Sequence, residues 1–243
     1  MQKLENKVVV ITGAGSGVGQ ATAWRLAEEG AQLVLVGRTE ATLQETAARL
    51  DPAKTLIYPC DVAKPEMVAG LAETVQRKLG RVEVLVIAAG VNVPRRALAE
   101  LSLEDYQQII DINLNGAFLC VQAFLPIMRQ QGEGTIINLA SVAGLQASPV
   151  AGAAYAISKF GMRGLNQAIN AEEQKNGIRA CAIFPAEINT PILDRRPTPP
   201  SSEARLQMLQ SEDLADCIAL VAMLPSRAVV EEITIRPLAR PGQ

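Results

Sequence analysis

Apolar positions along the chain fall into short runs that alternate with helix-like amphipathic stretches. In several runs nearly every position is apolar and often β-branched, which is typical of strands covered on both faces. We expect strands at residues 8–12, 32–37, 55–59, 82–87, 134–140, 178–184 and 233–235. Strands that alternate with helices predict an α/β fold built on a doubly wound, seven-stranded parallel sheet flanked by helices.

The longest helical pattern covers residues 102–131, and Ser102 followed by Asp105 is a helix-start signature. Residues 191–202 instead hold four prolines and little periodicity, which predicts a loop that covers a site. We place this substrate loop at about residues 190–210. With no internal repeat and no second boundary, residues 1–243 are interpreted as a single domain.

Composition narrows the range of functions. The net charge is −2 with both signs interspersed, so we expect no nucleic-acid partner and no anionic membrane partner. The charged start MQKLENK, and the lack of an apolar run near the roughly 18 residues that cross a bilayer, predict a soluble, cytoplasmic protein. The four cysteines form no C-x-x-C pair and are expected to be reduced, mostly buried thiols. Histidine is absent, so we expect no metal site and a general base of another type.

Residues 12–19, TGAGSGVG, lie between the first strand and a helix. Such a turn presents backbone N–H groups and the positive end of the helix dipole, which together suit phosphate. Gly13 is expected to turn the chain, Gly17 to let a pyrophosphate approach and Gly19 to let the helix pack on the sheet. Ser16 and Val18 complete this candidate phosphate site. The spacing departs from G-x-G-x-x-G, so the loop alone also fits a turn without a ligand.

A second motif gives the loop its context. Thr12, Gly13, Gly17 and Gly19 match T-G-x-x-x-G-x-G, and Tyr155 to Lys159, YAISK, resembles Y-x-x-x-K. With Asn113 in DINLNGAF and Ser141 in NLASVAG, the chain resembles the short-chain dehydrogenase/reductase family over almost its whole length. The resemblance implies a Rossmann-like fold and an oxidoreductase that uses NAD(P). It also implies a catalytic set of Asn113, Ser141, Tyr155 and Lys159.

Tyr155 and Lys159 are four residues apart in a helical pattern, so they share one face. Lowering the pKa of a phenol from about 10 to about 7 needs roughly 4 kcal/mol, which a cation about 4 Å away can supply. We therefore expect a lowered pKa for Tyr155, which would exchange a proton with the substrate oxygen during hydride transfer. Ser141 would bond the same oxygen. By resemblance, Lys159 would also contact the nicotinamide ribose and Asn113 would support a water-linked proton path, although Asn113 also fits a backbone-bonding role.

The end of the second strand bears on the choice of cofactor. Arg38 stands where an acidic residue would bind the ribose of NAD, and a guanidinium there favours the 2′-phosphate of NADP. NADP(H) is the predicted cofactor, and Glu40 keeps NAD(H) as the alternative. The resemblance assigns further cofactor contacts to Asp61, Val62, Ala89, Gly90, Pro185, Ile188 and Thr190. Asp61 also fits a turn or cap role, because Pro65 follows closely.

Three departures from the family pattern affect the details. Ile87 and Ala88 replace the usual asparagine pair, and Ala186 replaces a glycine. The ending EITIRPLARPGQ lacks a common glycine pair, which leaves the substrate side and subunit contacts least determined.

The substrate is predicted to be a small carbonyl compound or secondary alcohol, because small apolar residues surround the serine: Ala143, Leu145, Ala147, Val150 and Ala151. Four loop arginines also fit an anionic substrate group, but solvated side chains are the favoured interpretation: Arg95, Arg96, Arg195 and Arg196. A general carbonyl reductase or 3-hydroxy acid dehydrogenase competes with a 3-oxoacyl thioester reductase, and a non-catalytic NADP-binding sensor or scaffold is the alternative of another class. The resemblance implies a homotetramer or homodimer formed through helices at 102–131 and 153–175.

Overall fold

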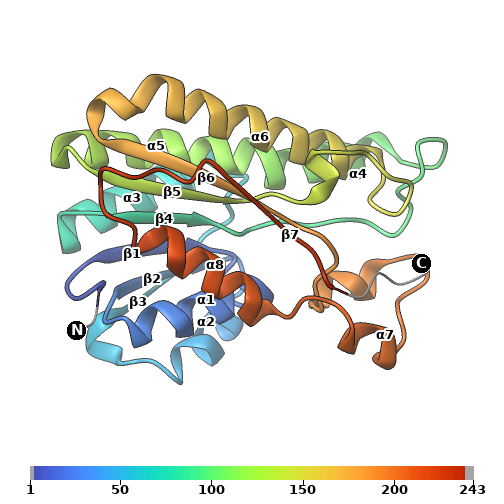
Figure 1. Cartoon of the computed structure of the whole chain (residues 1–243), viewed down its shortest axis with the longest axis horizontal. Coiled ribbons are helices and arrows are strands. Elements are labelled where there is room, and N and C mark those ends of the chain that lie inside the picture. The colour runs from blue at the N-terminus through green and yellow to red at the C-terminus, as the bar shows by residue number, and fades with distance from the viewer. Residues whose placement is uncertain (1–2, 239–243) are drawn as a thin grey trace.

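Seven parallel strands form the central sheet in the computed structural model, which describes residues 3–238 (Figure 1). Their order across the sheet is β3-β2-β1-β4-β5-β6-β7, so the direction of winding reverses between β1 and β4. The strands are β1 Val8–Thr12, β2 Gln32–Gly37, β3 Thr55–Pro59, β4 Val84–Ile87, β5 Gly134–Leu139, β6 Ile178–Pro185 and β7 Glu232–Ile235. The predicted strands and the doubly wound, Rossmann-like sheet are confirmed, with bounds that differ by at most two residues.

Helices cover both faces of this sheet, and Figure 1 shows α3, α5 and α6 on one side and α1, α2 and α8 on the other. The helices are α1 Gly17–Glu28, α2 Glu40–Ala47, α3 Pro65–Leu79, α4 Leu103–Ile110, α5 Gly116–Gln131, α6 Ala153–Glu173, α7 Ser202–Leu206 and α8 Ser211–Ala222. The inner strands are covered on both faces, so their side chains are buried at successive positions, whereas the edge strands β3 and β7 are partly exposed.

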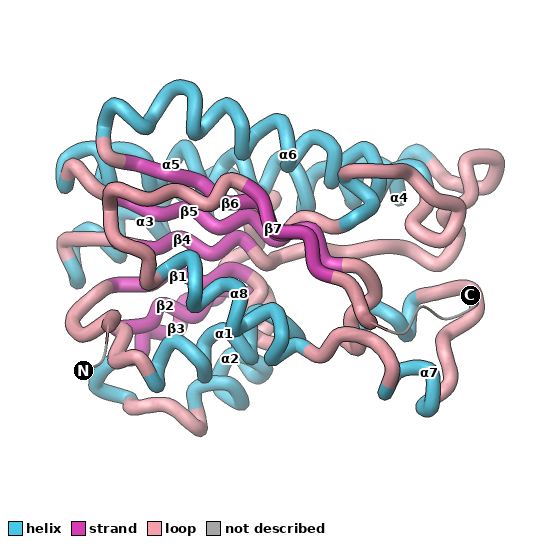
Figure 2. Tube along the Cα trace, viewed as in Figure 1, coloured by secondary structure: helices cyan, strands magenta, loops and turns pink. Residues whose placement is uncertain are grey.

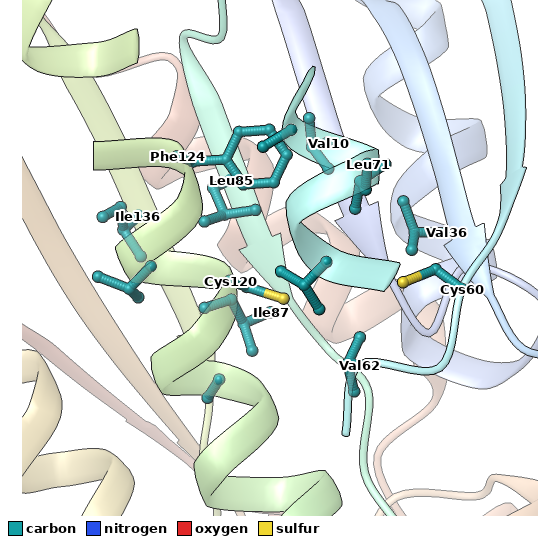
Figure 3. Close-up of a cluster of buried hydrophobic side chains, with 14 of the residues drawn as sticks. Val10, Val36, Cys60, Val62, Leu71, Leu85, Ile87, Cys120, Phe124 and Ile136 are labelled. Carbon is teal, nitrogen blue, oxygen red and sulfur yellow. The ribbon is translucent and has the colours of Figure 1, made fainter. Parts of the chain in front are cut away.

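One apolar cluster fills the space between the sheet and α3 and α5. Figure 3 shows Phe124 of α5 and Leu71 of α3 packed against strand residues such as Leu85. Cys60 and Cys120 lie in the same cluster, and the four cysteines are free thiols, as predicted. Burial raises the pKa of the Cys120 thiol to about 12, so this side chain behaves as a small apolar group.

The segment predicted as one helix at 102–131 is two helices joined by a π-helical turn. Ser102 begins α4 as expected, and its hydroxyl accepts a hydrogen bond of 3.0 Å from the Asp105 N–H. Asp111–Asn115 then forms the π-helical turn, which separates α4 from α5. An apolar periodicity does not reveal such a change in backbone hydrogen bonding, so the pattern predicted a continuous helix.

The combined segment Leu103–Gln131 is long and apolar enough to cross a membrane by length and composition alone. Core helices of soluble proteins meet the same criterion, and this one packs Cys120, Phe124 and Met128 into the core. The expected lack of a membrane partner remains a prediction.

The loops that follow the carboxyl ends of the strands lie at the end of the molecule that also carries α7 (Figure 2). The predicted substrate loop is partly helical, because Pro191–Arg195 forms a 3₁₀ helix and Ser202–Leu206 forms α7. Its two ends are joined, since Ile188 forms a β-bridge with Leu209. In doubly wound sheets the crevice at the reversal of strand order is the usual ligand site, and here it lies beyond β1 and β4.

Candidate active site

The glycine turn after β1 is fixed by close backbone contacts. Gly13 has a φ of +69°, and a Cβ there would lie 2.8 Å from the Ala89 backbone nitrogen. Gly19, in the first turn of α1, lies against the Gly13 carbonyl too closely to accept a side chain. Ser16 is the N-cap residue of α1, but no side chain caps this helix. The N–H groups of its first turn are thus not bound by a capping side chain, and Ser16 to Gly19 line the cavity. Their binding of a phosphate remains a prediction.

Thr12 braces the segment in which the usual asparagine pair is missing. Its buried hydroxyl accepts hydrogen bonds from the Ala88 and Ala89 N–H groups, at 3.1 and 3.2 Å, and donates one to the Val86 carbonyl at 3.4 Å. The backbone after β4 is thus held by a side chain from β1.

Tyr155 lies in the first turn of α6, opposite Ser141 at the end of β5. The Ser141 hydroxyl accepts a hydrogen bond from the Ala143 N–H at 3.1 Å and lies close enough to the Tyr155 hydroxyl to affect its pKa. The ring is partly exposed to the crevice, yet the protein atoms around its hydroxyl desolvate it and raise the pKa of Tyr155. The nearby Ser141 hydroxyl and the charges of Arg96 and Arg196 oppose that rise without cancelling it. The prediction of a lowered pKa is wrong in this structure.

Lys159 lies one helical turn after Tyr155, on the same face of α6, as predicted. Its Nζ donates to the Leu139 carbonyl at 2.7 Å and lies 5.5 Å from the centre of the Tyr155 ring. The side chain is 3% exposed, and this burial lowers the pKa of Lys159 to about 7. An ammonium that is charged only in part near neutrality provides less stabilisation of a phenolate. The prediction for Tyr155 left out the desolvation of its own hydroxyl, which is the main cause of the raised pKa, and it assumed a fully charged lysine.

Asn113 is buried within the π-helical turn. Its side chain accepts from the Val91 N–H at 2.8 Å and donates to the Val91 carbonyl at 3.0 Å and to the Ser158 hydroxyl at 3.2 Å. Ser158 in turn donates to the Tyr155 carbonyl at 2.7 Å. Asn113 therefore joins the segment after β4 to the start of α6 by the backbone-bonding role that the sequence also allowed. Its part in a water-linked proton path remains a prediction.

A cavity of about 810 Å³ runs from the glycine turn to Tyr155. It is lined by most of the predicted residues: Gly13, Ser16, Gly17, Val18, Gly19, Arg38, Ala89, Gly90, Ser141, Tyr155, Lys159, Pro185, Ile188 and Thr190. Asp61 and Val62 are not among the lining residues, and the Asp61 carboxylate accepts from the Ala63 N–H at 3.1 Å in a local turn. Their predicted contact with adenine is not tested by this arrangement.

Arg38 lies at the end of the groove nearest β2. Its side chain is exposed and makes no ion pair within the described residues 3–238. Glu40 instead belongs to the first turn of α2, where it accepts a hydrogen bond of 3.2 Å from Gln44, and it does not line the groove. Of these two residues, only Arg38 lines the cavity.

The substrate end of the groove differs from the prediction at one residue. Arg95 is exposed, as expected for a solvated loop arginine, whereas Arg96 is only 6% exposed. Its guanidinium donates to the carbonyls of Val93, Val150 and Arg195, at 2.8, 3.2 and 2.6 Å. The sequence interpretation missed this because the three carbonyls come from separate loops that meet only in the folded chain.

The remaining predicted substrate residues divide between groove and core. Four of the five predicted apolar side chains line the groove: Ala143, Ala147, Val150 and Ala151. The fifth, Leu145, packs against the cluster of Ala140, Ala182 and Phe184. Arg195 is exposed at the groove, and Arg196 forms an ion pair of 2.8 Å with Glu187.

The groove fits a dinucleotide. Its first part offers a glycine turn with an uncapped helix start, which suits a pyrophosphate. Its second part leads past Gly90 to the hydroxyls of Ser141 and Tyr155. A Cβ at Gly90 would lie 3.8 Å from the Lys159 Nζ. A nicotinamide held along this path would present its ring to those hydroxyls.

Comparisons with known proteins agree with this geometry. A family model described as short chain dehydrogenase matches residues 7–200. An uncharacterized oxidoreductase of Staphylococcus epidermidis is 32% identical over 239 residues, which are 98% of this chain and 100% of that protein. Among solved structures, the 3-ketoacyl-(acyl-carrier-protein) reductase of Brucella melitensis complexed with NADH is 28% identical, with a TM-score of 0.88 over 97% of this chain and 98% of the other.

The alcohol dehydrogenase of Thermococcus sibiricus, complexed with 5-hydroxy-NADP, is also 28% identical, with a TM-score of 0.86 over 98% of this chain and 99% of the other. Relatives of this fold thus hold either NADH or a derivative of NADP. Motifs, sheet order, groove and relatives all agree: the chain belongs to the short-chain dehydrogenase family and is an NAD(P)-dependent oxidoreductase.

Proposed function

We propose that this protein transfers a hydride between NADP(H) and a small carbonyl compound or secondary alcohol, with Tyr155 as the acid and base. The observation that carries the proposal is that the neighbouring hydroxyls of Ser141 and Tyr155 line the same groove as the glycine turn. A substrate oxygen placed between them meets two donors at once.

The cofactor supplies or accepts the hydride at the substrate carbon. During reduction, Tyr155 gives its proton to the carbonyl oxygen as negative charge develops there, and Ser141 stabilises that charge by a hydrogen bond. The raised pKa of Tyr155 keeps the proton on the phenol at neutral pH, which suits this direction. Oxidation requires the phenolate, so it is expected to speed up as the pH rises.

Lys159 contributes position as well as charge. Because its Nζ is bound to the Leu139 carbonyl, the ammonium has a fixed place beside the Tyr155 ring. In its charged form it favours the phenolate, and since Nζ also donates to the Met162 Sδ at 3.3 Å, one N–H of the ammonium is left for a ribose hydroxyl.

The preference for NADP(H) is supported by Arg38, which faces the groove while Glu40 bonds to Gln44 on α2. A guanidinium binds a phosphate through forked, charge-assisted hydrogen bonds, and no carboxylate lines this end of the described groove to repel it.

A panel of ketones, aldehydes and 3-oxo esters with NADPH, and of alcohols with NADP, tests the proposal. Turnover by the wild type but not by Tyr155→Phe supports it. An acetoacetyl thioester in the same panel separates the 3-oxoacyl thioester reductase from the general carbonyl reductase. Tight NADP binding with no turnover of any member would instead favour the non-catalytic sensor.

We also propose a homotetramer or homodimer assembled through α5 and α6. Large apolar side chains on these helices are about half exposed, at 49% for Phe118, 49% for Ile157 and 44% for Phe160. Light scattering should give two or four chains, and Phe160→Lys should shift the mass downward. A wild-type mass of one chain would contradict the proposal. The cytoplasmic location proposed from the sequence can be checked by fractionation.

A further inference from the structure

Arg96 is a buried cation that the proposed proton transfer does not use. It is 6% exposed, and within residues 3–238 no carboxylate lies in ion-pair distance of it. Its partners are three backbone carbonyls, which carry only partial charge. Buried charges in proteins are normally paired, because the desolvation cost of an unpaired charge is several kcal/mol.

The surroundings of Arg96 add to this cost. Gly152, the N-cap residue of α6, packs so closely that a Cβ there would lie 2.6 Å from the Arg96 Cβ. Arg96 therefore lies beside the start of α6, where the helix dipole presents its positive end. Burial and the nearby charge of Arg196 both lower the pKa of Arg96. The helix dipole and the charge of Arg196, which both disfavour a cation here, would favour a negative group bound at the same place.

The free hydrogen-bonding capacity of Arg96 matches one anion. A guanidinium has five N–H groups, and the three bonds to carbonyls use Nε once and each terminal nitrogen once. One N–H remains on each terminal nitrogen, so the guanidinium keeps two donors for the oxygens of a carboxylate. Arg196 is a weaker candidate, because Glu187 already pairs with it at 2.8 Å.

Arg96 also lies close to the reaction site. It lines the same cavity as Ser141 and Tyr155, and its charge acts on the Tyr155 hydroxyl. A carboxylate bound to Arg96 would therefore place a nearby carbonyl or hydroxyl group of the same small molecule at Tyr155.

We propose that Arg96 binds the carboxylate of the substrate, so that the protein acts on a small oxo or hydroxy carboxylic acid. This inference rests on the proposed function, because it names the substrate class of the same site. Of the four loop arginines expected to be solvated, Arg96 is the one whose burial contradicts that expectation.

Matched pairs of substrates test the proposal. Reduction by NADPH is measured for pyruvate, acetoacetate and levulinate and for their methyl esters. Each ester lacks the charge of its acid, and the three acids differ in the distance from the carbonyl to the carboxyl group. We expect at least one acid to exceed its ester about tenfold or more in kcat/KM. A wild type that reduces esters as well as acids would overturn the inference while leaving the proposed function standing. Preference for a phosphate-bearing ketone such as dihydroxyacetone phosphate would overturn the carboxylate assignment.

Variants separate binding from a structural role. Arg96→Gln should lower kcat/KM about 10- to 100-fold on the preferred acid and less than about threefold on its ester. Arg95→Gln, which changes the exposed neighbour, is the matched control and should leave both values unchanged. Equal losses on acid and ester would mean that Arg96 only holds the loops together. Arg96→Lys keeps the positive charge but not the guanidinium, and it should retain part of the preference for the acid over the ester. This variant also tests the proposal if Arg96→Gln folds poorly.

A binding measurement makes the result independent of turnover. In the presence of NADP, butyrate should raise the Tm of the wild type more than butyramide does, and Arg96→Lys should reduce that difference. If no ketone is reduced by the wild type, the proposed function fails. The butyrate measurement then decides the role of Arg96 by itself, and equal shifts for butyrate and butyramide would refute it.

Discussion

Replacing Arg38 with leucine should remove the preference for NADP without weakening the binding of NAD. Arg38 is exposed and unpaired in the described chain, so its attraction to a phosphate is partly screened by water. A unit charge pair about 4 Å apart contributes about 1 kcal/mol in water and about 4 kcal/mol at an effective dielectric of about 20. The exposure of Arg38 excludes the top of that range, and an intermediate value of about 1.4 to 2.8 kcal/mol corresponds to a 10- to 100-fold change in Kd.

The assay is a titration of NADP and NAD against wild type and Arg38→Leu, followed by the fluorescence of the reduced cofactors or by calorimetry. The Kd for NADP should rise about 10- to 100-fold, and the Kd for NAD should change less than about threefold. Because the interaction is exposed, the preference should also shrink as salt is raised. Glu40→Gln is the matched control and should leave both constants unchanged, since Glu40 bonds to Gln44. Equal losses for the two nucleotides, or a wild type that prefers NAD, would refute the reasoning.

Two further predictions concern buried polar groups of the site. Thr12→Val leaves the Ala88 and Ala89 N–H groups without their acceptor, so the free energy of unfolding in urea should fall by about 1–3 kcal/mol and NADP binding should weaken. Thr12→Ser keeps the hydroxyl and should retain both the stability and the NADP affinity of the wild type. An unaltered unfolding free energy in Thr12→Val would contradict this role. Lys159 has a folded-state pKa of about 7, below its unfolded value, so between these values the unfolded chain binds more protons and stability rises with pH. The unfolding free energy of wild type relative to Lys159→Met should therefore increase from pH 7 to pH 9, and a flat difference would show that Lys159 is not desolvated.

Much of the fold follows from local patterns in the sequence. Val8–Thr12 is buried at every position because helices cover both faces of the sheet, so a continuous β-branched run of five residues already indicates a strand. The glycine turn was equally predictable, since Gly13 and Gly19 permit contacts that a side chain would block.

What the sequence could not show depends on contacts between distant segments. The burial of Arg96 requires Val150 and Arg195 to converge on it from separate loops, and no local pattern records that. The raised pKa of Tyr155 likewise depends on how fully its hydroxyl and Lys159 are desolvated by the packed chain. The π-helical turn at Asn113 leaves the apolar periodicity unchanged and so escaped the pattern as well.

The central claim is that the Tyr155 hydroxyl transfers the proton at a groove built to hold the nucleotide. Its most direct test is a single-turnover measurement of NADPH oxidation by Tyr155→Phe with a ketone that the wild type reduces, together with the Kd for NADPH. Removing a general acid costs about 10²- to 10⁴-fold in rate. The account predicts a loss of that size with a Kd within about threefold of the wild type, whereas an undiminished rate of hydride transfer would contradict it.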